Sequence, residues 1–464
     1  ICACLVGSEM CIRDRVLTAL TVGALYCLYK WYEKGLKGIP WLAILLMSCG
    51  TLTKGPVGTI ISCLVVGIFL LLRGVNFFKA FLLLSAWAIL SLILPFCWYV
   101  AAYQQGGEEF LALVMEENFG RMTNTMSYNS CVNPWHYNFV TLFAGYVPWT
   151  LLVVLSLFSL TYHKFSIQPA AWWKRFTTWI KNMDPVDLFS FTSIVVIFVF
   201  YCIPQSKRSV YLMPIYPFIA YFLAKYLFYL VKKQSKVIKV YGSILAVISL
   251  LLFTCFIVLK CGLIPETIFQ GRHAQDNINF MRAIQNISGA GALFLIAIPT
   301  ILGIYWWFYQ RKNALNNRFL YALVVLTMGL YLALDGAYQP AALNSKSVKF
   351  IATEIEKVAP ESEGTMYEFI EESLHAAGDP VHYFELNFYL HNRLDNFYEK
   401  RPSEGFLLIG TNDAEKYLPE FEKEGYQFEE EYESPKRVLR QIAKIYKFVK
   451  NQQPENTETT PIVE

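Results

Sequence analysis

Four cations border apolar segments, in positions where they could bind an anionic group. Lys207 and Arg208 are adjacent between two long apolar runs, and Lys54 lies in a tight Thr-Lys-Gly-Pro sequence. Arg121 closes the stretch Glu-Glu-Asn-Phe-Gly-Arg. A Lys ammonium acts on a phosphate as a point charge, whereas an Arg guanidinium offers a planar fork of donors. We interpret Lys207 and Arg208 as ligands of a lipid-linked phosphate. For Lys54, a side chain that simply extends to the membrane interface is an equal alternative.

The elements that must position these cations are membrane-spanning helices. The chain of 464 residues is 55% hydrophobic and only 16% charged, whereas soluble domains carry about a quarter charged residues. Its apolar residues form runs of about 17–23, long enough to cross a hydrocarbon core of about 30 Å. We predict a mainly α protein, a polytopic transmembrane helix bundle with about ten spans. The expected spans are 16–29, 39–52, 56–72, 79–100, 138–160, 186–203, 211–230, 238–260, 291–309 and 319–336.

The loops between these spans fall into two alternating sets, and one set holds most of the Lys and Arg. Positive loops mark the cytoplasmic side. They contain Lys30, Lys34, Lys37, Arg73, Lys79, Lys164, Lys174, Arg175, Lys181, Lys232, Lys233, Lys236, Lys239, Arg311, Lys312 and Arg318. Lys54, Arg121, Lys207 and Arg208 then lie on the outer side of the membrane, as does the chain after residue 336. We expect a multi-pass protein of the bacterial cytoplasmic (inner) membrane with an extracytoplasmic C-terminal domain.

Both ends of the chain differ from its middle. Residues 1–15 have no initiator Met, no signal-peptide layout and no helix that continues them. They resemble translated adapter sequence, so we expect them to be foreign; a short native tail is the alternative. The first span runs inward, so a protein beginning in the cytoplasm would have an odd number of further helices, and we predict an N-terminally truncated fragment. Residues 451–464 are polar, which favours disorder.

Residues 337–450 are predicted to form a small extracytoplasmic α/β domain. Residues 337–464 hold about two-thirds of all Asp and Glu, and this acidic balance does not suggest nucleic acid. Patterning predicts helices over Ser345–Lys357, with Ser345 or Ser347 as N-cap, and Asn412–Glu424, and strands over Thr365–Ile370, Gly405–Gly410 and Tyr426–Glu433.

The outer loop 101–137 carries further polar residues. Glu108–Phe119 has helical spacing of apolar residues and is expected to lie along the membrane surface. Glu117 and Arg121, four residues apart, could pair on one helical face. His136 stands between Trp135 and Tyr137, where an interfacial anchor is as good a reading as a substrate contact.

Three motifs follow one another on the predicted outer face: Thr-Lys-Gly-Pro (53–56), Glu-Glu-Asn-x-x-Arg (116–121) and Ser-Lys-Arg-x-x-Tyr-x-x-Pro (206–214). Together they resemble membrane glycosyltransferases of the aminoarabinose transferase and protein O-mannosyltransferase (dolichyl-phosphate-mannose-protein mannosyltransferase) family, over roughly residues 16–340. The resemblance implies a C-type glycosyltransferase fold. It also implies inverting transfer of a sugar from a polyprenyl phosphate to a lipid (lipid A-like) or protein acceptor of the cell envelope.

By this resemblance, Lys54 and Lys207 hold the donor phosphate, with Arg208 and Arg121 as further contacts. Arg208 occupies a position that the family often fills with other residues, and Asn118 stands where aminoarabinose transferases often have His. Resemblance and chemistry together assign the cavity and substrate contacts to Glu116, Glu117, Asn118, His136 and Tyr211. The family's catalytic base lies in the first outer loop, which we expect to be missing here.

Other functions remain open at the level of sequence. An O-antigen ligase or polymerase would use a lipid diphosphate donor, and a transporter or flippase of an anionic lipid should show inverted repeats or broken helices. No cofactor is predicted, a divalent metal stays possible, and no Cys/His spacing fits a metal site. The expected partners are a polyprenyl-phosphate-linked sugar, a lipid or protein acceptor and membrane lipids.

Overall fold

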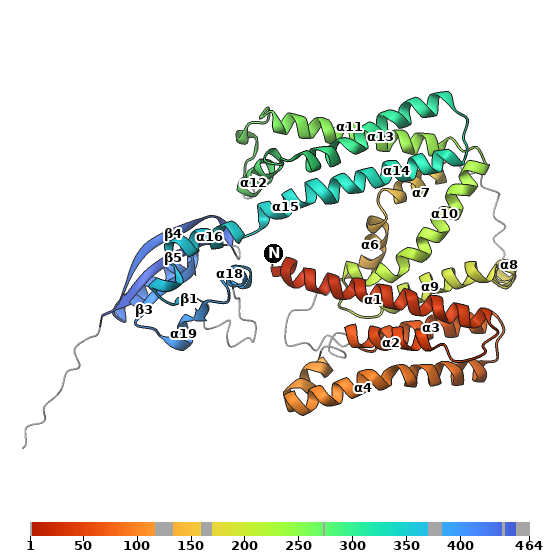
Figure 1. Cartoon of the computed structure of the whole chain (residues 1–464), viewed down its shortest axis with the longest axis horizontal. Coiled ribbons are helices and arrows are strands. Elements are labelled where there is room, and N and C mark those ends of the chain that lie inside the picture. The colour runs from red at the N-terminus through yellow and green to blue at the C-terminus, as the bar shows by residue number, and fades with distance from the viewer. Residues whose placement is uncertain are drawn as a thin grey trace, which may run out of the picture. The chain divides into compact units, whose positions relative to one another are not determined.

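The computed structural model describes residues 2–116, 133–158, 169–271, 274–369, 383–438 and 441–451. These residues divide into two compact units, shown in Figure 1. A helical unit comprises Val6–Leu251 and Ile298–Leu330, and a C-terminal unit comprises Leu252–Ala297 and Tyr331–Glu464 with Ile1–Leu5. Each unit has its own buried apolar clusters.

Helices dominate the chain and confirm the predicted polytopic membrane fold. Six of the described helices are long and apolar enough to cross a membrane, or seven with one bent pair. The helices up to residue 333 are α1 (Cys2–Glu33), α2 (Trp41–Lys54), α3 (Val57–Leu72), α4 (Phe77–Met115), α6 (Tyr137–Gly145), α7 (Trp149–Leu157), α8 (Pro169–Asn182), α9 (Pro185–Cys202), η2 (Ser209–Ile215), α10 (Tyr216–Lys232), α11 (Val237–Lys260), α12 (Ala274–Gln285), α13 (Ala290–Lys312) and α14 (Asn317–Ala333).

Two expectations about these helices are wrong in detail, and a third is confirmed. Residues 2–15 are helical and continuous with the first span, because no Pro interrupts Cys2–Glu33 and each added residue gains a hydrogen bond. The single span expected at 138–160 is instead the pair α6 and α7, bent by 101°. The helix expected from Glu108 is present: a break at Gly107, whose φ of 57° only Gly adopts readily, separates it from the preceding part of α4.

Small residues bring α2, α3 and α4 close together. A Cβ on Gly58 of α3 would lie 2.8 Å from the backbone carbon of Gly50 on α2. Beside this contact, buried hydroxyls form a chain in which Thr51 bonds Thr59 at 2.9 Å and Thr59 bonds Ser91 of α4 at 3.0 Å. Small residues and hydroxyl bonds of this kind are what join helices within a membrane.

The C-terminal unit contains a five-stranded mixed sheet. Its strands are β1 (Met366–Glu368), β2 (Leu394–Asn396), β3 (Glu404–Gly410), β4 (Tyr426–Val438) and β5 (Gln441–Lys450), in the order β2-β1-β3-β5-β4. β2, β1 and β3 are parallel, whereas β5 is antiparallel to both β3 and β4. The α-helices among its described residues from 339 on are α15 (Gln339–Lys346), α16 (Lys349–Val358), α18 (Phe384–Tyr389), α19 (Phe397–Lys400) and α20 (Thr411–Lys423).

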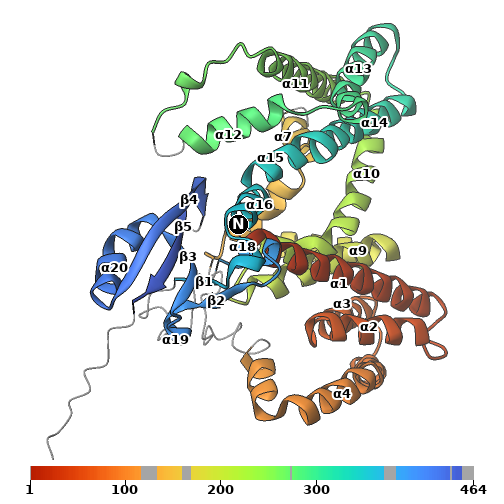
Figure 2. The same cartoon turned by 60° about the vertical axis from the view of Figure 1, so that its left-hand side comes forward.

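Alternate residues of β3 serve the two faces of this sheet. Phe406 and Leu408 pack with α16 and α18, whereas Leu407 and Ile409 pack with α19 and α20. Figure 2 shows α20 and α16 on opposite sides of the strands. The helices and strands expected here are present, with β5, β2, α18 and α19 in addition. The expected helix is divided, since α15 ends at Lys346 and α16 starts at Lys349, where the Ser347 hydroxyl accepts a hydrogen bond from Lys349 N at 3.2 Å.

Candidate functional site

The turn between α9 and α10 carries two of the cations that the sequence singles out. α9 starts at Pro185 with the Asp184 carboxylate accepting a hydrogen bond from Val186 N, and ends at Cys202. Pro204 follows, and the chain is extended at Arg208 before the 3₁₀ helix η2. Leu212 and Ile215 of η2 are fully buried in the apolar core. Burial of these two side chains fixes the turn against the bundle.

Lys207 in this turn is buried, with 6% of its surface exposed. Its ammonium donates to the carbonyl of Asn133 at 3.4 Å, and the Asn133 side-chain amide donates to the carbonyl of Lys207 at 2.9 Å. Within the described part of the chain, no carboxylate forms an ion pair with Lys207. Because an ammonium loses hydration when buried, one long hydrogen bond leaves Lys207 suited to an anionic ligand.

Lys54 lies in the last turn of α2, at the tip of the hairpin with α3. Gly55 ends α2 with a φ of 75°, and its N–H donates to Thr51 O at 2.8 Å. Pro56 then precedes α3, where a missing N–H costs nothing. The Gly-Pro pair therefore turns the chain sharply and leaves the Lys54 side chain at the end of the hairpin.

The two turns meet through an aromatic contact. The Lys54 ammonium lies 3.9 Å from the ring centroid of Tyr211 in η2, and Tyr211 packs against Tyr201 of α9 at 5.5 Å. Lys54 also forms an ion pair with Asp14. Asp14 belongs to the segment predicted to be foreign, whereas Tyr211 belongs to the motif at 206–214.

Other predicted site residues are less well placed or lie outside the description. Arg208 is half-buried beside Lys207. Glu116 is the C-cap of α4. His136 is exposed, 5.7 Å from the Trp135 ring, which fits the interfacial alternative. Glu117, Asn118 and Arg121 lie outside the described residues.

Sequence reasoning did not nominate three residues that hold the site together. Asn133 bridges to the turn at Lys207, Tyr201 supports Tyr211, and the Asn138 amide donates to Tyr201 O at 2.8 Å. Asn138 is buried directly after the Pro-Trp-His-Tyr sequence, and a buried amide needs partners. An Asn at the start of an apolar helix was therefore the available signal. Among the described residues, no group of three His, Cys, Asp or Glu could hold a metal ion.

Comparison with known proteins identifies the fold of the chain. No family model matches the chain. A protein of Aquifex aeolicus (strain VF5), described only as uncharacterized, is 27% identical over 206 residues, which are 44% of this chain and 36% of that protein. The chain thus matches about a third of the length of this curated relative.

Two solved structures are similar over most of the chain. The crystal structure of ArnT from Cupriavidus metallidurans bound to undecaprenyl phosphate has a TM-score of 0.58 at 16% identity, covering 92% of this chain and 74% of that one. The apo state of the same protein has a TM-score of 0.52 at 15% identity, with the same coverage. This chain shares the fold of ArnT. It is a multi-pass membrane protein with a small α/β region at its C-terminal end.

Proposed function

We propose that the protein transfers a sugar from a polyprenyl-phosphate donor to a lipid or protein acceptor at the outer face of the bacterial cytoplasmic membrane. The observation that supports this most is the meeting of Lys54 with Tyr211, four residues after Lys207. The motifs at 53–56 and 206–214, which resemble donor-phosphate ligands of the family, are thus in contact with each other. The fold shared with ArnT, a protein whose structure is known with undecaprenyl phosphate, agrees with the proposal.

In this proposal Lys54 and Lys207 bind the donor phosphate and stabilise it as the leaving group. During inverting transfer, the acceptor hydroxyl attacks the anomeric carbon and gives its proton to a general base, as the bond to the phosphate oxygen breaks. Negative charge then grows on the phosphate, and fixed cations in a site poor in water lower the energy of that state. The described residues supply the cations, whereas we assign no catalytic base.

The test is sugar transfer by purified protein in liposomes containing a polyprenyl-phosphate sugar. Lys54→Ala and Lys207→Ala should each lower the rate by about 10²–10³-fold, the usual cost of removing one group that stabilises transition-state charge. Lys37→Ala, which removes an exposed Lys elsewhere in the helical unit, should leave the rate unchanged. Normal turnover in both site variants would overturn the proposal.

One observation favours transport of an anionic lipid as a second candidate. A broken helix is expected of transporters, and α6 and α7 meet at 101° around Tyr146 and Pro148. The Tyr146 hydroxyl donates to Tyr216 O at 2.5 Å, which joins the break to the start of α10. Movement of a labelled polyprenyl phosphate across liposomes without an acceptor, and no transfer with one, would favour this candidate.

A further inference from the structure

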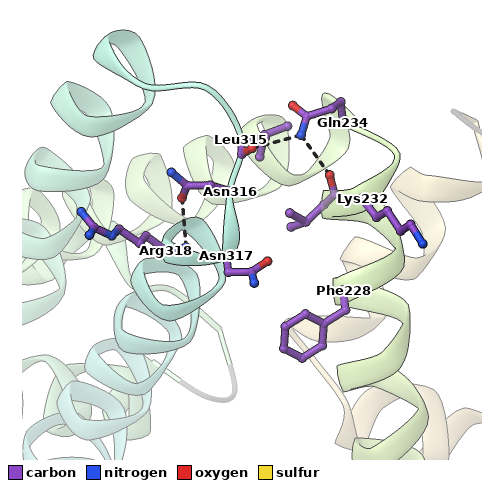
Figure 3. A pocket seen from close by; sticks show the side chains of 8 residues that line it. Phe228, Lys232, Gln234, Leu315, Asn316, Asn317 and Arg318 are labelled. Atoms are coloured by element: carbon purple, nitrogen blue, oxygen red, sulfur yellow. Dashed lines mark hydrogen bonds between the residues drawn. The ribbon is translucent and has the colours of Figure 1, made fainter.

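An open pocket of about 710 Å³ lies between the end of α10 and the loop that joins α13 to α14. Phe228 and Val231 of α10 and Leu315 of the loop give it apolar walls. Figure 3 shows Asn317 and Phe228 pointing into the gap, whereas the Lys232 and Arg318 side chains start at its two rims and extend away from it in opposite directions. The pocket therefore combines an apolar wall, an amide and two cations.

The pocket lies at a strongly positive end of the helical unit. Residues 231–240 and 309–318 contain Lys or Arg at seven positions and neither Asp nor Glu. The seven are Lys232, Lys233, Lys236, Lys239, Arg311, Lys312 and Arg318. Unbalanced positive charge at the end of apolar helices attracts anionic headgroups, and basic pockets between helices are known binding places for them.

Local hydrogen bonds fix the pocket frame and leave its rim cations available. The Gln234 amide donates to Leu315 O at 3.0 Å, which ties the end of α10 to the loop. The Asn316 side chain accepts from Arg318 N at 3.0 Å and so caps α14. Lys239 is already engaged, since it donates to the carbonyls of Gln310 and Asn313 at 3.0 Å. The side chains of Lys232 and Arg318 are exposed.

We propose that this pocket binds the phosphodiester headgroup of an anionic phospholipid, with Lys232 and Arg318 as its charge partners and Asn317 as a hydrogen-bond donor. The acyl chains would run along Phe228, which is 53% exposed. The site is distinct from the one proposed above for the donor. Tyr216 and Lys232 are opposite ends of the 17-residue α10, which at 1.5 Å per residue places them about 25 Å apart.

The experiment measures lipid binding by native mass spectrometry of detergent-purified protein, titrated with phosphatidylglycerol or phosphatidylcholine. Phosphatidylglycerol should bind more tightly than phosphatidylcholine. The double variant Lys232→Gln, Arg318→Gln should weaken phosphatidylglycerol binding about 30-fold, because each cation near a headgroup contributes roughly a factor of five. Asn317→Leu, which keeps both charges, should weaken it less.

The matched control is Lys233→Gln, Lys312→Gln, which removes the same charge from neighbouring residues that do not line the pocket. Equal loss of phosphatidylglycerol binding in the control pair would overturn the proposed pocket site. The binding would then reflect general attraction of the lipid to the positive surface. Competition by millimolar inorganic phosphate would show a soluble-anion site instead. Unchanged binding in the Lys232, Arg318 double variant, with unchanged thermal unfolding, would also overturn the proposal.

Discussion

The ammonium of Lys54 lies over the ring of Tyr211, with 3.9 Å between the nitrogen and the ring centroid. This contact joins the tip of the α2–α3 hairpin to η2, beside the ion pair that the same ammonium forms with Asp14. A ring face attracts an ammonium without neutralising it, whereas the Asp14 carboxylate, which also pairs with Lys54, offsets part of its charge. The contact between the Tyr211 ring and Lys54 can be tested without removing the charge of Lys54.

Replacing Tyr211 tests the aromatic contact. Tyr211→Phe keeps the ring face and should bind a polyprenyl phosphate nearly as tightly as the unaltered protein. Tyr211→Leu removes it and should weaken binding by roughly 0.5–2 kcal/mol, the usual strength of a cation–π contact. Binding is measured by titration with undecaprenyl phosphate. Equal affinities of the Phe and Leu variants would show that the ring does not orient Lys54.

Asn133 is predicted to hold the turn at Lys207. Asn133→Ala removes the 2.9 Å bond to Lys207 O, which should cost about 0.5–1.5 kcal/mol of stability and weaken carrier binding. Thermal unfolding in detergent and the same titration measure the two effects. Gln205→Ala is the control, because Gln205 is exposed and its backbone carbonyl remains. An Asn133 variant that matches this control in both assays contradicts the prediction.

The close contact between α2 and α3 makes Gly58 sensitive to substitution. In Gly58→Ala the new Cβ would lie 2.8 Å from the Gly50 backbone, so the helices must separate. Overpacking of this kind typically costs about 1–3 kcal/mol, seen as a lower unfolding temperature in detergent. Gly291→Ala adds the same methyl group where no atom lies within 4 Å, and it should change little. The idea fails if both variants unfold alike.

An ion pair in the sheet of the C-terminal unit predicts a pH effect. The Lys444 ammonium donates to the Glu430 carboxylate at 2.7 Å and holds the pKa of Glu430 below its usual value. A depressed pKa stabilises the fold above the pKa of the unfolded carboxyl, and this contribution is lost as the pH falls through the folded pKa. Glu430 is 40% exposed, so the gain is at most about 1 kcal/mol.

Lys444→Gln should therefore raise the pKa of Glu430 and move acid unfolding to higher pH. The unfolding midpoint, followed against pH by circular dichroism, measures the shift. Lys423→Gln, at an exposed position of α20, supplies the control. An identical acid limit for Lys444→Gln and the control would contradict the stabilising role of the pair.

The helices were predictable because apolar runs of membrane length leave few other structures open to the chain. Their interruptions were not. The bend between α6 and α7 falls near Pro148, yet the run from 138 to 160 is mainly apolar and carries no charged residue, so hydropathy alone does not register the break. In the C-terminal unit, β5 has alternating Ala443 and Ile445 and was within reach of sequence reasoning.

The candidate site was predictable residue by residue but not in its contacts. Lys54 and Lys207 stand out because cations are rare in the loops predicted to lie outside. Their framework depends on hydrogen bonds and packing between distant segments, such as Asn133 with Lys207 and Tyr211 with Tyr201. Such pairings arise from helix packing, which a single sequence does not encode in its spacing.

The hairpin of α2 and α3 is shorter than a bilayer. These helices have 14 and 16 residues, and at 1.5 Å per residue they are about 21 and 24 Å long. The hydrocarbon core measures about 30 Å. A hairpin anchored at one interface therefore ends several ångströms below the other, and the bilayer must thin there or admit water. Lys54 at the tip of the hairpin would then draw a lipid's phosphate from the interface toward the membrane interior, while the acyl or prenyl chain stays in its own leaflet.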